Sequence, residues 1–186
     1  MEDQVDRVLR SLGGNPLASD PAIYCFYSKG SLELILSTHV DDKKGGGTEA
    51  MKAYVRAGLE KAFGSLTVQE SSFIHCGIMH EQTSDGIKMH QQHYVKQLNS
   101  MDTTGINPDK PETLNAVQQS ADLSLLGGLS WLVQTRMDIA VYVCYLQRNS
   151  KATTTEHYLK VNKLLRFVKR KPVWLFYGKL KGPFRV

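Results

Sequence analysis

The sequence lacks the features of a secreted, disulfide-stapled or membrane-spanning chain. Its only cysteines, Cys25, Cys76 and Cys144, are odd in number and far apart, so we expect no disulfide framework and a reducing environment. No apolar run reaches the roughly 18 residues of a membrane span, and residues 1–10 do not show the basic-then-apolar pattern of a secretion signal. We therefore predict an intracellular protein, cytoplasmic or nuclear, with no membrane partner.

Acidic residues are scarce at the C-terminal end. Residues 150–186 contain ten Lys or Arg and a single acid, Glu156, which gives that segment a charge of +9 and leaves −4 for the rest of the chain, whose total is +5. A basic end on an otherwise mildly acidic chain favours a polyanionic partner, nucleic acid first. The alternative is a helix whose lysines are merely solvated.

Hydrophobic residues make up 41% of the 186, enough for a core, and their periodicity predicts an α+β chain that is rich in strands first and helical afterwards. We expect helices over 3–12, 49–63, 90–99, 121–133, 137–148 and 153–171. We expect strands over 22–27, 32–40, 66–70, 72–81 and 87–89, with hairpins at residues 28–31 and 83–86. The predicted divisions are 1–102, a linker over 103–120, and a helical part over 121–186.

Two adjacent carboxylates, Asp41 and Asp42, follow the strand predicted over 32–40. Magnesium prefers carboxylate and phosphate oxygens, and two such ions can align the attacking and leaving oxygens of phosphoryl transfer. Because side chains alternate on a flat strand, this pair could converge on a metal only where the chain bends. A solvated surface turn is the alternative interpretation.

Six blocks of the sequence resemble, in the same order, the reverse transcriptase of copia-type LTR retrotransposons. The first is DPAIYCFY at 20–27. The second is THVDD at 38–42, which is similar to the family's YVDD box. The others are LEKAFGSLTVQESSFIHCGI at 59–78, GIKMHQQHYVKQLNSM at 86–101, LSLLGGLSWLVQTRMDIAVYVCYLQRNS at 123–150 and HYLKVNKLLRFVK at 157–169.

The resemblance implies part of a polymerase palm, built from β-hairpins and crossing helices, followed by a helical thumb or connection region. It implies RNA-directed DNA synthesis with Mg²⁺ held by Asp41 and Asp42, and His39 near the primer end. Template–primer backbone would pass the basic side of the C-terminal helix. The residues implied there are Lys160, Lys163, Arg166, Lys169 and Arg170.

The sequence also departs from the family. His39 replaces the usual Tyr, Met137 replaces a Pro, and Lys43-Lys44 with three glycines replace an apolar strand, so we expect the strand after the carboxylates to be short or distorted. No aspartate before Asp41 fits the family's upstream catalytic segment. We therefore expect a partial polymerase, part of a Pol polyprotein, that is inactive alone. Alternatives are a non-catalytic nucleic-acid-binding remnant and a decayed or partial gene.

Other candidate sites carry less weight. The histidines at 75, 80, 90 and 93, with Cys76, match no zinc spacing, so we interpret them as surface and strand residues. Arg136 and Asp138 could pair or cap a helix. Core packing is the expected role for most of the aromatic residues at apolar spacing. These are Tyr24, Phe26, Trp131, Tyr142, Tyr145, Trp174 and Phe176.

Overall fold

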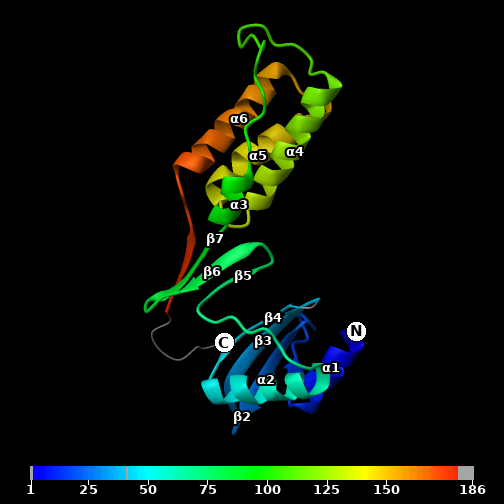
Figure 1. The fold of residues 1–186 in the computed structure, drawn as a ribbon, viewed down its shortest axis with the longest axis vertical. Helices are drawn as coiled ribbons and strands as arrows, with labels where there is room; N and C mark the ends of the chain where they lie inside the picture. Colours follow the sequence, from blue (N-terminus) through cyan, green and yellow to red (C-terminus); the bar gives the residue numbers. More distant parts are fainter. Residues whose placement is uncertain (1, 41, 180–186) are drawn as a thin grey trace. The chain divides into compact units, whose positions relative to one another are not determined.

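The computed structural model describes residues 2–40 and 42–179. It confirms the α+β class, with helices and two antiparallel four-stranded sheets. Contacts divide the chain into two units, residues 1–69 and 70–186, whereas the sequence predicted divisions at 102 and 120. Each unit has its own sheet and its own helices (Figure 1).

The first unit is a sheet of order β1-β2-β3-β4 with two helices packed against it. Its core joins residues of both helices to alternate residues of β2 and β3, among them Leu9, Phe26, Leu34 and Leu59. The elements are α1 (Glu2–Ser11), β1 (Asn15–Pro16), β2 (Ile23–Ser28), β3 (Ser31–His39), β4 (Asp42–Gly47) and α2 (Glu49–Phe63).

Helix α2 forms over the residues predicted for it. Thr48 is its N-cap, and the Thr48 hydroxyl accepts a hydrogen bond from the Met51 amide, which satisfies one of the free amides of the first turn. Gly64, with φ 87°, ends the helix in a left-handed conformation that glycine adopts without steric cost. Val55 and Leu59, one turn apart, are buried and join the core of the first unit.

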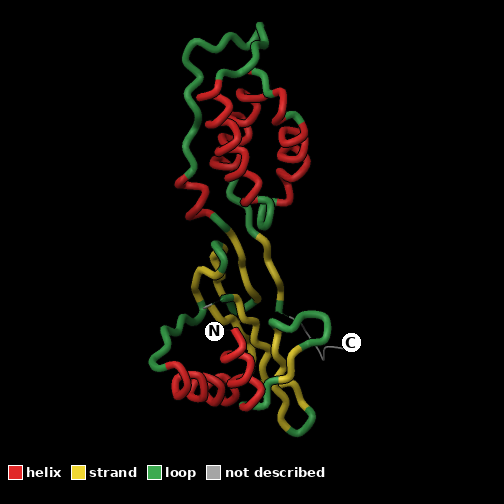
Figure 2. Tube along the Cα trace, turned by 90° about the vertical axis from the view of Figure 1, so that its right-hand side faces the viewer, coloured by secondary structure: helices red, strands yellow, loops and turns green. Residues whose placement is uncertain are grey.

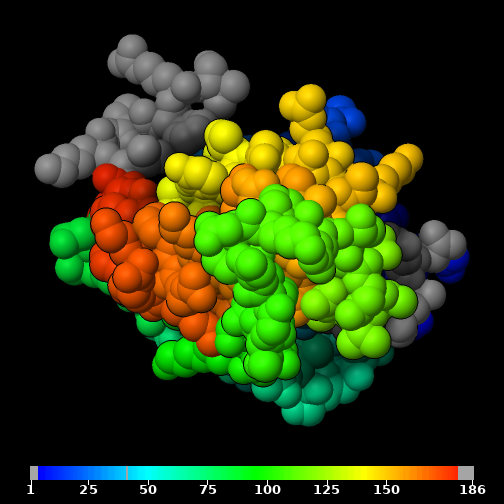
Figure 3. All heavy atoms as spheres, turned by 90° about the horizontal axis from the view of Figure 1, so that it is seen from above, coloured from blue at the N-terminus to red at the C-terminus, as the bar shows by residue number. Residues whose placement is uncertain are grey.

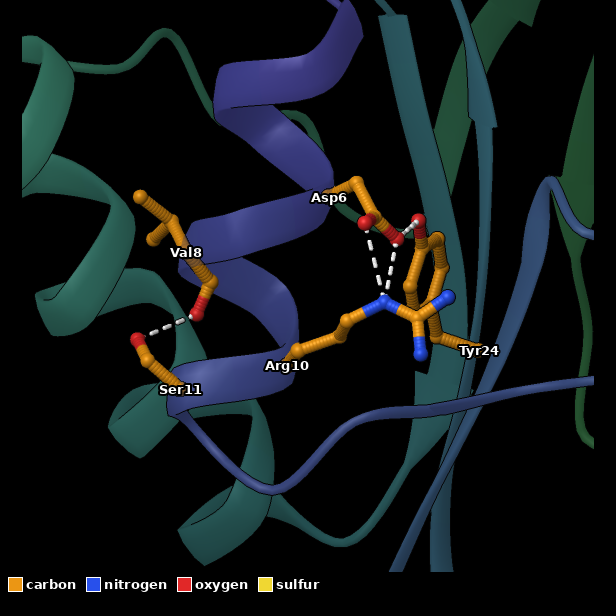
Figure 4. Close-up of polar contacts among 5 residues, drawn as sticks. All are labelled: Asp6, Val8, Arg10, Ser11 and Tyr24. Atoms are coloured by element: carbon orange, nitrogen blue, oxygen red, sulfur yellow. Dashed lines mark hydrogen bonds and ion pairs between the residues drawn. The ribbon is translucent and has the colours of Figure 1, made fainter.

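Asp6 joins α1 to the sheet (Figure 4). The Tyr24 hydroxyl of β2 donates to its carboxylate at 2.6 Å, and Arg10 Nε donates to both oxygens at 2.8 and 2.9 Å. The Tyr24 hydrogen bond, followed by those of Arg10, lowers the pKa of Asp6. Through these hydrogen bonds, Asp6 gives the polar side of α1 a contact with the sheet.

Over residues 70–179, the described part of the second unit, a sheet of order β5-β6-β7-β8 is combined with four α-helices. Its helical core is formed mainly by α4, α5 and α6, which pack side by side (Figures 1 and 2). The elements are β5 (Ser72–His75), β6 (Ile78–Gln82), β7 (Gly86–His90), α3 (Gln92–Gln97), α4 (Ala116–Leu132), η1 (Met137–Ile139), α5 (Ala140–Arg148), η2 (Ser150–Ala152), α6 (Thr155–Arg170) and β8 (Leu175–Gly178).

Three local predictions were wrong in the second unit and in the segment that leads into β5. Residues 66–70 form no strand, and the strand predicted over 72–81 is two strands separated by a turn at Cys76 and Gly77, both of which have positive φ. The predicted linker is helical from Ala116 onward. Its earlier part lies against α6 (Figure 3), where the Thr155 amide donates to the Glu112 carbonyl at 2.9 Å.

Candidate carboxylate turn and basic helix face

The carboxylate pair lies where β3 turns into β4. His39 and Asp42 are opposite each other in the register, so only residues 40 and 41 form the connection. Val40 has φ 49°, the left-handed conformation that two-residue hairpin turns require. Asp42 is exposed at the first position of β4, and the Asp41 prediction lies outside the described residues. We call His39, Val40, Asp41 and Asp42 the carboxylate turn.

The strand after the carboxylates is regular, so the prediction of a short or distorted strand was wrong. β4 keeps an unbroken antiparallel register with β3 over six residues. Lys43 and Lys44 fit because both remain partly exposed, which avoids burying an ammonium group. The following glycines allow β3 to approach closely, since a Cβ on Gly45 would lie 2.9 Å from Leu36 Cδ1.

His39 and Asp42 lie on the face of the sheet opposite to the helices. Leu34 and Leu36 point into the core beneath α1 and α2, and side chains alternate along a strand, so His39 and its partner Asp42 point the other way. Both are exposed. Among residues 2–40 and 42–179, no group of three His, Cys, Asp or Glu side chains is placed to hold a metal ion.

The amphipathic pattern of α6 is confirmed. Its apolar side enters the core of the second unit, with Tyr158, Val161, Leu165 and Val168 at 2% exposure or less. We call the opposite, cationic side the basic face. Its members are Lys160, Lys163, Arg166, Lys169 and Arg170.

The basic face contains one compensated cation and four others. Lys160 Nζ lies 2.7 Å from a Glu156 carboxylate oxygen and 5.3 Å from the centre of the Tyr145 ring. The hydrogen bond with Glu156 raises the pKa of Lys160 and lowers that of Glu156. The other four side chains are exposed, and none has an ion-pair partner within the described part of the chain.

The paired residues Arg136 and Asp138 have a structural role. Arg136 is 1% exposed. Its Nε and Nη2 each donate to one oxygen of Asp138 at 2.8 Å, and its Nη1 donates to the Val168 carbonyl of α6 at 3.3 Å. These hydrogen bonds lower the pKa of Asp138. The pair thus connects the segment before α5 to the end of α6.

The histidines give no sign of a zinc centre in the described residues. His80 is buried, stacks on Phe73 with 5.1 Å between ring centres, and has Nδ1 3.0 Å from the Ile78 carbonyl. His90 Nε2 lies 3.4 Å from Glu81 Oε2. His75, His80 and His90 lie in strands as interpreted, but His80 is buried rather than at the surface, and His93 lies in α3.

The prediction of core packing was wrong for five of the seven aromatic residues. Tyr24 and Phe26 are buried, but the others are 45–60% exposed. Trp174 lies just before β8 and Phe176 lies within it, and the sequence did not predict this strand. Alternating aromatic residues after Pro172 were the available signal, because this is a pattern of short strands.

No protein-family model matches this chain, and searches of curated proteins and of solved structures found no match either. None of the described helices has the length and apolar character to cross a membrane.

Proposed function

We propose that this chain is a segment of a copia-type reverse transcriptase, an RNA-directed DNA polymerase. The observation that carries the proposal is the ordered set of six sequence blocks. The α+β fold is compatible with it. So is the position of the exposed Asp42 at the start of β4, opposite His39 of β3.

The chemistry would be attack of a primer 3′-hydroxyl on the α-phosphate of an incoming nucleotide. Asp41 and Asp42 would supply oxygen ligands for Mg²⁺, and bound Mg²⁺ would neutralise charge on the phosphates. His39, on the same sheet face as Asp42, would contact the primer end. Two neighbouring carboxylates form a weak metal site by themselves, so we expect the chain alone to be inactive as a polymerase.

Metal binding can be tested without catalysis. Titration with paramagnetic Mn²⁺ should broaden the amide NMR signals near the β3–β4 turn, and Asp41→Asn/Asp42→Asn should remove that broadening. Glu49→Gln, which removes one carboxylate beyond the other end of β4 at the start of α2, serves as the control and should leave it. Unchanged broadening in the double variant would refute the assignment, as would primer extension that survives Asp41→Ala.

The alternative function is non-catalytic binding of nucleic acid through the basic face. The observation that favours it is a row of four exposed cations without ion-pair partners in the described residues, on a helix whose other side is fixed in the core. Lysine and arginine at such positions bind by neutralising phosphates and carry no base specificity.

This binding can be measured by fluorescence anisotropy with a labelled oligonucleotide. Lys163→Gln/Lys169→Gln should weaken it, whereas Asp41→Ala/Asp42→Ala should retain it. Lys29→Gln/Lys110→Gln removes the same charge at other exposed positions and is the matched control. Equal losses in the two lysine pairs would show that only net charge matters and would reject the basic face as the site.

A further inference from the structure

Strand β8 adds exposed aromatic side chains to the edge of the second sheet. Phe176 is 52% exposed and lies opposite Lys88 of β7 in the register. Lys88 Nζ also lies 4.5 Å from the centre of the Trp174 ring, and Trp174 is 49% exposed. We call Lys88, Trp174 and Phe176 the aromatic platform.

The segment of chain that carries the two rings of the aromatic platform is cationic. From residue 169 to 179 the sequence contains Lys169, Arg170, Lys171 and Lys179 and no acid. The first two belong to the basic face, which therefore leads along the chain directly to Trp174. Lys88 itself is compensated, since its Nζ lies 3.2 Å from Glu81 Oε2. The charge that could attract a polyanion thus comes from the flanking residues.

We infer that the aromatic platform stacks the bases of single-stranded nucleic acid whose phosphates are held by the adjacent cations. The inference rests on the proposed nucleic-acid binding and adds a contact to bases that the basic face by itself does not provide. Aromatic rings beside a cationic track are the arrangement that binds single strands without sequence preference. Core packing accounts for only the buried part of each ring, since Trp174 is 49% and Phe176 52% exposed.

The test compares two oligonucleotides of about 12 units, one of thymidines and one of abasic sugars, bound to the full chain. Base stacking requires bases, whereas phosphate contacts do not. Trp174→Leu, which keeps an apolar side chain, should weaken binding of the thymidine strand by about fivefold or more and leave the abasic strand unchanged. Trp174→Phe should restore most of the loss.

Tryptophan fluorescence supplies a second measurement. Trp131 is the other tryptophan of the chain, so a Trp131→Phe background leaves Trp174 as the sole emitter. Binding of the thymidine strand should quench that emission, and the abasic strand should not. Circular dichroism and thermal melting of each variant verify that the substitution has not disrupted the fold.

The outcomes separate this inference from the proposed function. If both strands bind and Trp174→Leu affects them equally, or Trp174 emission is unchanged, the aromatic platform is refuted while phosphate binding stands. If neither strand binds, the aromatic platform and the nucleic-acid binding proposed for the basic face both fail. If Trp174 emission shifts only with vesicles of phosphatidylserine and phosphatidylcholine, the surface binds lipid and the inference is overturned.

Discussion

At the scale of single residues, the adjacent glycines Gly46 and Gly47 of β4 differ in whether the structure has room for a side chain. A Cβ on Gly47 would collide with the Glu33 carbonyl oxygen and lie 2.7 Å from Leu34 Cα, both backbone atoms, whereas a Cβ on Gly46 meets nothing within 4 Å. The Thr48 amide donates to the same Glu33 carbonyl at 2.8 Å, so β3 is held close to the end of β4. Gly47 is therefore required by packing, and Gly46 is not.

We expect Gly47→Ala to lower the free energy of unfolding by about 1–3 kcal/mol, because the backbone must shift to admit the methyl group. Gly46→Ala should raise it by about 0.5 kcal/mol, because alanine loses less conformational entropy than glycine in a strand. Urea denaturation of the two variants measures both values. Equal effects would contradict the close approach of β3 at Gly47.

Asp122 is a buried carboxyl in α4, 1% exposed, and its Oδ1 has no hydrogen-bond partner in the described structure. Burial raises its pKa above 3.8, and the nearby charge of His157 opposes this only in part. The folded state therefore holds the proton more tightly than the unfolded state. The stabilisation from this group is complete below about pH 4 and is lost as pH rises through the raised pKa.

Asp122→Asn should consequently gain stability relative to the unchanged chain as pH increases, by about 1 kcal/mol near neutrality. Denaturation curves for both proteins between about pH 4 and pH 8 provide the comparison. Asp109→Asn, at an exposed loop position, controls for the loss of one negative charge. A stability difference that is independent of pH would show that Asp122 does not titrate in this range.

At the scale of elements, the Arg136–Asp138 pair holds α6 to the segment before α5. The two partners differ in burial, since the Arg136 side chain is 1% exposed and the Asp138 side chain 36%. Asp138→Ala leaves a buried guanidinium without its carboxylate, at a cost of about 3 kcal/mol. Arg136→Met leaves a carboxylate that water can reach, so we expect the smaller loss, about 1–2 kcal/mol.

Thermal or urea unfolding of the two variants tests this order. Asp138→Asn should lose less stability than Asp138→Ala, because its amide keeps one oxygen acceptor for the guanidinium. Since the pair lowers the pKa of Asp138, its stabilisation is present above pH 4 or so and is lost as the pH falls through the lowered pKa. A larger loss in Arg136→Met than in Asp138→Ala would contradict the argument from burial.

Elements whose signals are local could be predicted from sequence, and elements defined by distant partners could not. Helix α2 has an N-cap, an apolar stripe and a terminal glycine, and α6 has an apolar stripe followed by Pro172, so both were predicted closely. Strand β8 has four residues and pairs with β7, far away in the sequence, so propensity alone was too weak to identify it. Residues 66–70 have strand-like composition but no partner.

The candidate site was also predictable from the sequence only in part. That Asp42 lies at a turn, and that α6 has one cationic side, follow from hydrophobic runs and helical period. The sequence did not indicate the compensation of Lys160 by Glu156 or the exposure of Trp174. Which side of a short strand is covered depends on the elements that pack there, and periodicity does not identify them.

At the scale of the whole molecule, charge is distributed unequally between the units. Residues 1–69 carry 8 basic and 9 acidic residues, a net charge of −1, whereas residues 70–186 carry 15 and 9, a net charge of +6. The excess is concentrated on and after α6. Polyanion binding should therefore depend on a local group of cations and release the counterions displaced from the phosphates there.

The salt dependence of binding tests this localisation. For single strands each neutralised phosphate contributes about −0.7 to the slope of log K against log salt concentration. Four uncompensated cations on the basic face then predict a slope of about −3. Lys163→Gln/Lys169→Gln should reduce it to about −1.5, and Lys29→Gln/Lys110→Gln should leave it unchanged. If both pairs reduce the slope equally, the oligonucleotide responds to overall charge and the second unit has no defined phosphate-binding surface.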